Sequence, residues 1–256
     1  MMHETLDIGA SNRSALQSLE ISLRWCDAIT TCTLGSISSL DTISTRLTSI
    51  PAIGTDIRDN SHLRLTAAIL RIAELEAWKR TAVQGGCLSV VELVKRAGEI
   101  ESLPQSQSLV SIAAEPFARP SQRPPVSQSI MAQLLEIFTR AALVHLHVIV
   151  AGAGRKIPEI CAQVQEAVRL FVNVSAVHTL VHFAWPFCVV GCLAVGDDRK
   201  QLMGVLNSAS RSGTGAQRLA RTKVLVEECW RLFDEEKVLE ADWTVAINSL
   251  GNHTLI

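Results

Sequence analysis

Tyrosine is absent from this chain of 256 residues. Short-chain dehydrogenases have a similar length and use a tyrosine as their catalytic acid, so the absence excludes that class of enzyme. The sequence also lacks the G-x-S-x-G motif, with which an α/β-hydrolase presents its nucleophile, and the Walker loop that binds nucleotide phosphates. No catalytic residue is assigned, and we expect a protein that is not an enzyme.

An excess of charge of one sign is also missing. The chain has 24 basic and 25 acidic residues, a net charge of −1, and no long basic stretch, so we expect no direct DNA binding by this chain. Charged residues make up 19% and hydrophobic residues 48% of the sequence, and the mean hydropathy is +0.24. This composition is typical of a folded protein with a large core and excludes general disorder.

Closely paired cysteines are missing as well. The seven cysteines are scattered and no Cys-x-x-Cys pair occurs, which disfavours a zinc module and a disulfide framework and favours a reducing compartment. His178 and His182 lie four residues apart, as do Cys188 and Cys192, so a tetrahedral zinc site is one hypothesis. Because histidine and cysteine in apolar helices are more often core residues, we expect no metal site and no cofactor in this chain.

The N-terminus has no cationic segment followed by an apolar run, so we expect no secretory signal. An uncharged run over residues 170–196 is nevertheless long enough to span a bilayer. It carries Asn173 and two histidines, and Pro186 interrupts its helical hydrogen bonding near the middle. We interpret the run as two buried helices that meet at Trp185-Pro186, and a membrane span is the alternative.

Helical periodicity dominates what the sequence does contain. The apolar residues of segment 63–78 fall on one helical stripe, and Ser89 with Glu92 forms a capping-box pattern that starts the next helix. For that helix we expect one apolar face, formed by Val90, Leu93, Val94, Ala97 and Ile100. Similar patterns cover residues 130–151 and 215–235, and strand signals are weak. The predicted fold class is therefore all-α, an irregular multi-helix bundle.

Residues 104–129 interrupt this periodicity. They hold five of the eight prolines and many serines and glutamines, so we predict a disordered Pro/Ser-rich linker. Outside this linker we expect three further parts of the chain. We expect a poorly defined N-terminal helical segment over 1–60, one helical part of a domain over 61–103, and the C-terminal helical part of the same domain over 130–256.

Gly152 and Gly154 resemble the start of a dinucleotide-binding fingerprint, with Arg155 and Lys156 just behind. The third glycine of G-x-G-x-x-G is replaced by Ile157, and the preceding apolar run has the length of a helix and not of a strand. We therefore predict that one of the two glycines ends a helix in a left-handed C-cap. Pro158 then suits the first position of the next helix.

One stretch carries a family resemblance. AWPFCVVGCLAVGDDRKQLMGVL resembles the central signature of the fungal-specific transcription factor domain, the helical regulatory region of fungal zinc binuclear cluster regulators. The block VEECWRLFDEEKVLEADWTVAINSLG is similar to the family's closing block, in which Trp230 would lie late in one helix and Asp242-Trp243 would open the last. AALVHLHVIVAGAGRKIPEI is similar to an upstream helix of the family, with His145 in place of the usual tyrosine. We call the following matching residues the signature: Trp185, Pro186, Gly191, Cys192, Ala194, Asp198 and Arg199.

The resemblance implies a regulatory domain of a fungal transcription regulator that is non-catalytic and acts in the nucleus, with shuttling to the cytoplasm as an option. Its partners would be co-regulator proteins or a second copy of the chain, with a small-molecule effector as a further option, and no membrane. The family's zinc cluster needs six closely spaced cysteines, whereas residues 1–60 hold only Cys26 and Cys32. Zinc is therefore expected only in an upstream cluster that this chain lacks.

The candidate site residues are those that form either a ligand pocket or simply the core. They are Trp185, Pro186, Phe187, Cys188, Gly191, Cys192, Trp230 and Trp243. Of the two interpretations we favour the core. The alternatives to a regulatory domain are an α-helical enzyme with an unrecognised site and a membrane protein that uses residues 170–196.

Overall fold

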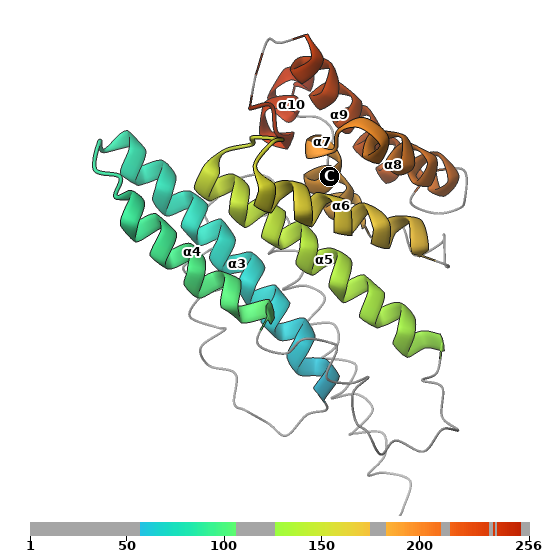
Figure 1. Cartoon of the computed structure of the whole chain (residues 1–256), viewed down its shortest axis with the longest axis horizontal. Helices are drawn as coiled ribbons and strands as arrows, with labels where there is room; N and C mark the ends of the chain where they lie inside the picture. Colours follow the sequence, from blue (N-terminus) through green and yellow to red (C-terminus); the bar gives the residue numbers. More distant parts are fainter. Residues whose placement is uncertain are drawn as a thin grey trace, which may run out of the picture.

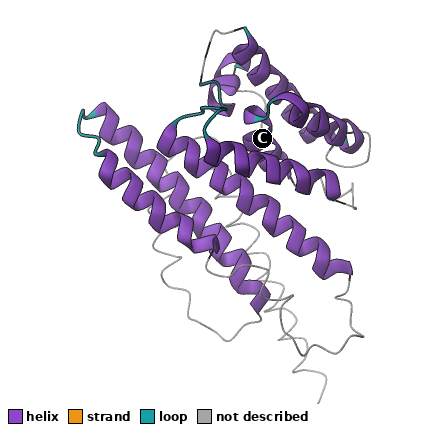
Figure 2. Ribbon diagram, in the orientation of Figure 1, coloured by secondary structure: helices purple, strands orange, loops and turns teal. Residues whose placement is uncertain are grey.

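The computed structural model describes residues 57–105, 126–174, 183–210, 216–235, 238 and 240–251. Within these residues the chain forms eight helices and no strand, which confirms the all-α prediction (Figures 1 and 2). The helices are α3 (Ile57–Gln84), α4 (Val90–Gln105), α5 (Val126–Ala151), α6 (Pro158–Asn173), α7 (Ala184–Leu193), α8 (Gly196–Ala209), α9 (Ala216–Asp234) and α10 (Trp243–Leu250).

Helix α7 lies between two groups of helices, α5 and α6 on one side and α9 and α10 on the other. The hairpin of α3 and α4 lies at one end of the molecule, and α5 runs alongside α3 (Figure 1). Helix α5 also packs on α6 and α7, while α7 contacts α9 and α10 on its other side. All nine residues from Trp185 to Leu193 are buried, so α7 is apolar all round because every face meets another element.

Helix α4 begins as the sequence predicts but buries less than expected. The Ser89 Oγ accepts a hydrogen bond from the backbone N–H of Glu92 at 3.3 Å, as an N-cap does. Leu93, Ala97 and Ile100 are buried, whereas Val90 and Val94 are 64% and 53% exposed. The predicted face is wrong at these two valines, because among the described elements α4 packs mainly on α3 and α5 and buries a narrow stripe.

The turn between α5 and α6 confirms the C-cap prediction. Gly152 has φ +83, a left-handed conformation that favours glycine, and its N–H donates to the carbonyl of Val148 at 2.9 Å. The next helix starts with Pro158, whose missing N–H would have had no intrahelical partner at this position. The Gly-Ala-Gly segment therefore joins two helices and does not follow a strand.

The uncharged run 170–196 is split between two helices, but not where the sequence analysis placed the break. Helix α6 ends at Asn173, and α7 begins at Ala184, with residues 175–182 outside the described part. Pro186 lies in the first turn of α7, where the backbone N–H groups have no intrahelical acceptor and a proline costs nothing. The predicted break at Trp185-Pro186 is wrong for this reason.

Among the described helices, the segment Ala132–Ala151 of α5 is long and apolar enough to cross a membrane. In its most apolar window 56% of the residues are buried against the rest of the protein. A buried core helix passes the same test of length and composition, so this segment is weak evidence for a membrane span.

The expected domain boundaries shift by a few residues. Helix α3 starts at Ile57 and so crosses the boundary expected at residue 60, while the remainder of segment 1–60 lies outside the described residues. Helix α4 extends to Gln105 and α5 begins at Val126, so both ends of the expected linker 104–129 are helical. The prediction of disorder falls on residues 106–125, which are also outside the described part.

A row of aromatic rings links α5, α6 and α7 through the core. Phe171 stacks on Phe187 with centroids 4.1 Å apart, and Phe138 stacks on both Phe183, at 5.5 Å, and Trp185, at 6.1 Å. Trp185 is only 6% exposed. Such pairs add to the free energy gained by burying the rings.

We predict that Trp185→Ala lowers the free energy of unfolding by about 3–5 kcal/mol, as truncation of a large core aromatic does. Urea unfolding followed by circular dichroism measures the change. The control is Val172→Ala on the exposed face of α6, for which we expect a change below about 0.5 kcal/mol. A loss below about 1 kcal/mol for Trp185→Ala would contradict the packing described above.

Candidate functional site

Four of the signature residues, Gly191, Cys192, Ala194 and Arg199, gather at the C-terminal end of α7. The last carbonyls of a helix have no intrahelical donor, and here side chains from other elements supply one. The Trp230 indole Nε1–H donates to the Gly191 carbonyl at 2.7 Å, Arg155 Nε to the Cys192 carbonyl at 3.1 Å, and Arg199 Nε to the Ala194 carbonyl at 2.9 Å. We call these three donors, Arg155, Arg199 and Trp230, the clasp.

Gly191 belongs to the signature because of close helix packing. A Cβ atom at this position would lie 2.9 Å from Cγ2 of Val226, closer than real side chains approach one another. The missing side chain allows α9 to lie directly on α7. Trp230 can then reach the Gly191 carbonyl from α9.

Arg155 is the most buried member of the clasp, with 5% of its surface exposed. Its Nη2 donates to the carbonyls of Cys192, at 2.5 Å, and Ala241, at 3.3 Å, and contacts the Cys229 thiol at 3.5 Å. The guanidinium also lies over the Phe233 ring at 3.8 Å. Arg155 therefore points from the Gly-Ala-Gly turn into the core and not toward solvent.

Within the described part of the chain, Arg155 forms no ion pair with a carboxylate. Burial lowers the pKa of this guanidinium, and the charge of Arg199 lowers it further. The negative end of the α7 dipole, where the carbonyls converge, provides the compensating charge.

Arg199 connects the clasp to the surface. Its guanidinium binds both carboxylate oxygens of Asp234, at 2.7 and 3.0 Å, and lies over the Trp230 ring at 5.0 Å. The hydrogen bond and charge of Arg199 hold the pKa of Asp234 below its ordinary value, although burial opposes them. Arg199 therefore ties the start of α8 to the end of α9.

Most of the candidate residues named from the sequence belong to the core. Trp185, Pro186, Phe187, Cys188, Gly191, Cys192 and Trp243 are buried, and Trp230 is half-buried. Burial raises the pKa of the Cys192 thiol, and the neighbouring thiols of Cys188 and Cys229 raise it further. The Cys192 thiol therefore remains protonated and chemically quiet.

Only two of the four residues in the zinc hypothesis lie within the described part of the chain. Cys188 and Cys192 are buried without a disulfide, while His178 and His182 lie outside the described residues. No group of three or more potential metal ligands occurs in the described ranges.

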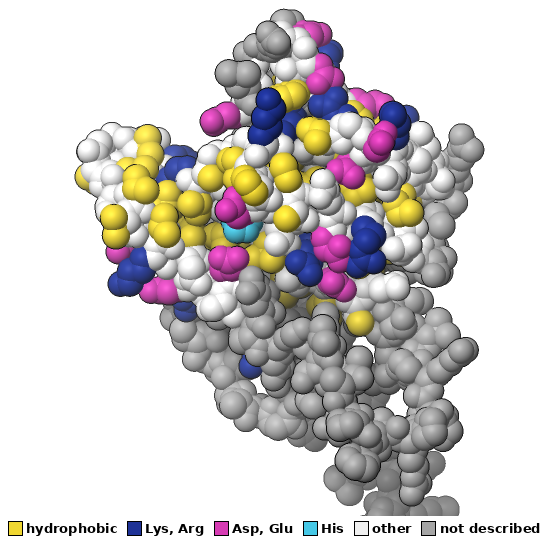
Figure 3. Space-filling model, viewed as in Figure 1, with side chains coloured by type: hydrophobic (Ala, Val, Ile, Leu, Met, Phe, Trp, Pro, Cys, Tyr) yellow, Lys and Arg dark blue, Asp and Glu magenta, His cyan; other side chains and the backbone are white. Residues whose placement is uncertain are grey.

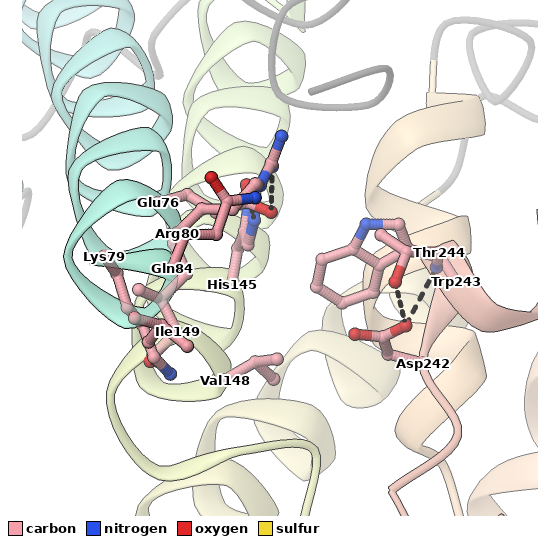
Figure 4. Close-up of a pocket in the computed structure, with 11 residues that line it drawn as sticks. Glu76, Lys79, Arg80, Gln84, His145, Val148, Ile149, Asp242, Trp243 and Thr244 are labelled. Atoms are coloured by element: carbon pink, nitrogen blue, oxygen red, sulfur yellow. Dashed lines mark hydrogen bonds and ion pairs between the residues drawn. The ribbon is translucent and has the colours of Figure 1, made fainter. Parts of the chain in front are cut away.

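A pocket of about 420 Å³ lies away from the signature, between α3, α5 and the start of α10. Figure 4 shows His145 of α5 and Trp243 of α10 facing one another, with Glu76 and Arg80 of α3 beside the imidazole. Of the candidate residues named from the sequence, only Trp243 lines this pocket. The other lining residues are Glu76, Lys79, Arg80, Val83, Gln84, His145, Val148, Ile149, Asp242 and Thr244.

Two contacts fix the orientation of the His145 ring. Its Nε2 lies 3.4 Å from a carboxylate oxygen of Glu76, and the ring meets Trp243 edge-on, with centroids 4.8 Å apart. Burial raises the pKa of Glu76, but the hydrogen bond and charge of His145, together with Arg80, outweigh it, and the pKa lies below the ordinary 4.5. Glu76 is therefore a carboxylate at neutral pH.

Polar atoms without partners cluster around this ring. His145 Nδ1, Trp185 Nε1 and Trp243 Nε1 are buried and have no hydrogen-bond partner in the part of the chain that the structure describes. His145 contacts both indoles, with a centroid distance of 6.3 Å to Trp185. Buried polar atoms without a partner are rare in folded proteins and call for a specific explanation.

The start of α10, which forms one wall of the pocket, is positioned by the N-cap residue Asp242. The Asp242 carboxylate accepts hydrogen bonds from the N–H groups of Thr244, at 2.9 Å, and Val245, at 3.1 Å. This N-cap starts α10 at Trp243. The predicted opening of the last helix at Asp242-Trp243 is thereby confirmed.

The fold gives the class of this protein, and comparison with known proteins gives its family. The fold defines an all-helical module without a recognisable catalytic motif in the described residues. The profile of the fungal specific transcription factor domain matches residues 25–256. The chain belongs to this family, as the resemblance of the signature predicts.

Several curated relatives are fungal transcription factors. The ustiloxin B cluster transcription factor of Aspergillus flavus is 29% identical over 193 residues, which cover 72% of this chain and 32% of the relative. The trichothecene biosynthesis transcription regulator of Trichoderma arundinaceum is 26% identical over 176 residues, 69% of this chain and 35% of the relative. The chain thus matches about a third of these relatives' length. No solved structure matches it.

We predict that Arg155→Met lowers the free energy of unfolding by about 2–4 kcal/mol, because two buried carbonyls lose their donor. Arg155→Lys keeps the charge but cannot reproduce the forked contacts, so we expect most of the same loss. The control is Arg169→Lys in an exposed pair with Glu166, for which we expect less than about 0.5 kcal/mol. Wild-type stability of Arg155→Met in urea unfolding would show that the clasp is dispensable.

The lowered pKa of Glu76 predicts a contribution to stability that depends on pH. Because the folded protein binds this proton less tightly than the unfolded chain, Glu76 stabilises the fold above pH 4.5 and loses this effect as the pH falls through its folded value. Glu76→Gln should therefore flatten the decline in unfolding free energy between pH of about 5 and about 3. Unfolding at a series of pH values tests this, with exposed Glu99→Gln as the control. An unchanged acid slope in Glu76→Gln would contradict it.

Proposed function

We propose that this chain is a non-catalytic regulatory domain of a fungal transcription regulator, and that the regulator controls a biosynthetic gene cluster. Membership of the fungal-specific transcription factor domain family carries this proposal. The relatives named for ustiloxin B and trichothecene biosynthesis point to the kind of genes under control. The regulator acts in the nucleus, with shuttling as an option.

The pairing of surface arginines with carboxylates supports a domain that does not itself bind DNA. Arg96, Arg169 and Arg231 form ion pairs within their own helices, and Arg199 pairs with Asp234. Figure 3 shows lysine and arginine interspersed with aspartate and glutamate on the face it displays. DNA-binding surfaces instead gather basic residues along one face. Contact with DNA would come from a separate segment that binds zinc or from a partner protein.

A surface for partner proteins is available at the α3–α4 end. Val83, Val90, Val91 and Val94 are exposed there, and Figure 3 shows hydrophobic side chains on this end of the molecule. Exposed apolar residues that cluster are typical of interaction sites. Their position supports contact with a co-regulator or with a second copy of the chain.

A second candidate function is an enzyme in which Glu76 orients His145 as a base. The close approach of the two side chains, at 3.4 Å inside a pocket, favours it. Against it, His145 Nδ1 is buried, and the hydroxyl of Thr244 in the same pocket already donates to Asp242. No nucleophile is therefore poised beside this base in the described residues.

A reporter assay tests the regulatory role. The chain is fused to a heterologous DNA-binding domain in a filamentous fungus and transcription from the matching promoter is measured. We expect the fusion to change transcription at least about threefold relative to the DNA-binding domain alone. The control fusion carries Arg155→Met, which should unfold part of the protein and lose the effect. Equal transcription from the intact fusion and from the DNA-binding domain alone, at equal protein levels, would refute the proposal.

A further inference from the structure

We propose that the pocket between α3, α5 and α10 binds a small, neutral, hydroxylated molecule, and that His145 and Trp243 recognise its hydroxyl group. The significance of such binding for transcription rests on the proposed function, whereas the binding itself does not. Three properties of the pocket lead to this class of ligand.

The first property is a matched pair of unsatisfied polar atoms. In the tautomer of His145 that donates its Nε2–H to Glu76, Nδ1 presents a lone pair that only a donor can satisfy. Trp243 Nε1 is a donor that needs an acceptor. Both side chains are almost fully buried and both line the pocket. A hydroxyl group is both donor and acceptor, so one such group has the chemistry that both atoms require.

The second property is the balance of charge around the pocket. Glu76 and Asp242 are matched by Lys79 and Arg80, and each has a protein partner. Arg80 pairs with Glu76, Lys79 donates to the carbonyl of Ile149, and Asp242 caps α10. The lining thus carries no excess of either sign, and a charged ligand would lose its hydration without gaining a counter-ion.

The third property is an apolar wall of suitable size. Val83, Val148, Ile149 and the Trp243 ring contribute hydrocarbon surface to a pocket of about 420 Å³. Ligand pockets usually measure roughly 300–1,000 Å³ and combine apolar walls with a few polar groups that fix orientation. A ring or short alkyl frame that carries hydroxyl groups has the size and character of this space.

Binding in this pocket should also leave a local signal at Trp243. Both nitrogen atoms are buried, so a hydroxyl reaches them only when the Trp243 ring turns aside. Trp243 lies at the first position of α10, next to the capping Asp242. The indole N–H resonance of Trp243 therefore reports directly on occupancy of the pocket.

The test uses the full chain labelled with ¹⁵N and resorcinol as the probe. We expect a saturable shift of the Trp243 indole N–H signal with a dissociation constant in about the millimolar range, as for small fragments. The matched probe is 1,3-dimethoxybenzene, which keeps the ring and the oxygen atoms but has no hydroxyl donor. It should bind at least about tenfold more weakly, because His145 Nδ1 then lacks a donor.

Two variants locate the site. His145→Phe keeps a ring at the position and removes Nδ1, so we expect it to abolish the preference for resorcinol. Val83→Trp narrows the pocket mouth from a side chain that is 55% exposed, so it should fold normally and weaken resorcinol binding at least about tenfold. The exposed control Val172→Ala on α6 should bind like the wild type.

Three outcomes would overturn the proposal. They are the absence of a saturable Trp243 shift with resorcinol, equal binding of the two probes, and unchanged binding in Val83→Trp. Any of them together with an active reporter fusion would reject the ligand site and leave the regulatory function standing. Clear resorcinol binding with an inactive fusion would reject the regulatory function and leave the ligand site standing.

Discussion

The capping of helix α7 by the buried Arg155 is the constraint on which the rest of the fold depends. A buried helix exposes its last carbonyls to an environment without water, where a missing donor is costly. Arg155, Arg199 and Trp230 satisfy these carbonyls from three separate segments. The guanidinium is in turn held by the negative end of the helix and by the Phe233 ring. Helices on both sides of α7 are thereby fixed to a single point.

The same capping links the signature to the pocket. Arg155 Nη2 also donates to the carbonyl of Ala241, the residue directly before the N-cap Asp242. Asp242 starts α10, and α10 begins with Trp243, which packs edge-on against His145. The clasp therefore positions one wall of the pocket, and a shift of Trp243 acts on the segment that Arg155 holds. If the proposed ligand binds, this connection would link the pocket to the core of the domain.

The signature of the family thus has a structural meaning in this chain. Gly191 allows α9 to approach, the Cys192 and Ala194 carbonyls accept the arginines, and Arg199 joins α8 to α9. These residues do not line the pocket between α3, α5 and α10. The residues that could recognise a ligand are His145 and its neighbours. Position 145 is also where the chain has a histidine in place of the tyrosine that is usual in the family that it resembles. A tyrosine carries its hydroxyl at the end of the ring, whereas His145 offers nitrogen atoms to both Glu76 and the pocket.

The sequence by itself determined the all-helical class and the local signals that start and end helices. Ser89, Gly152, Pro158 and Asp242 act where the sequence places them, because caps depend on residues within one turn. The tertiary structure decided which faces are buried. Val90 and Val94 are exposed because no further helix of the described residues covers this face of α4. Pro186 lies in the first turn of a helix because α6 ends well before it. The pocket depends on Glu76, His145 and Trp243, which come from three distant segments. Only packing brings these together, because no local pattern records the distance between helices.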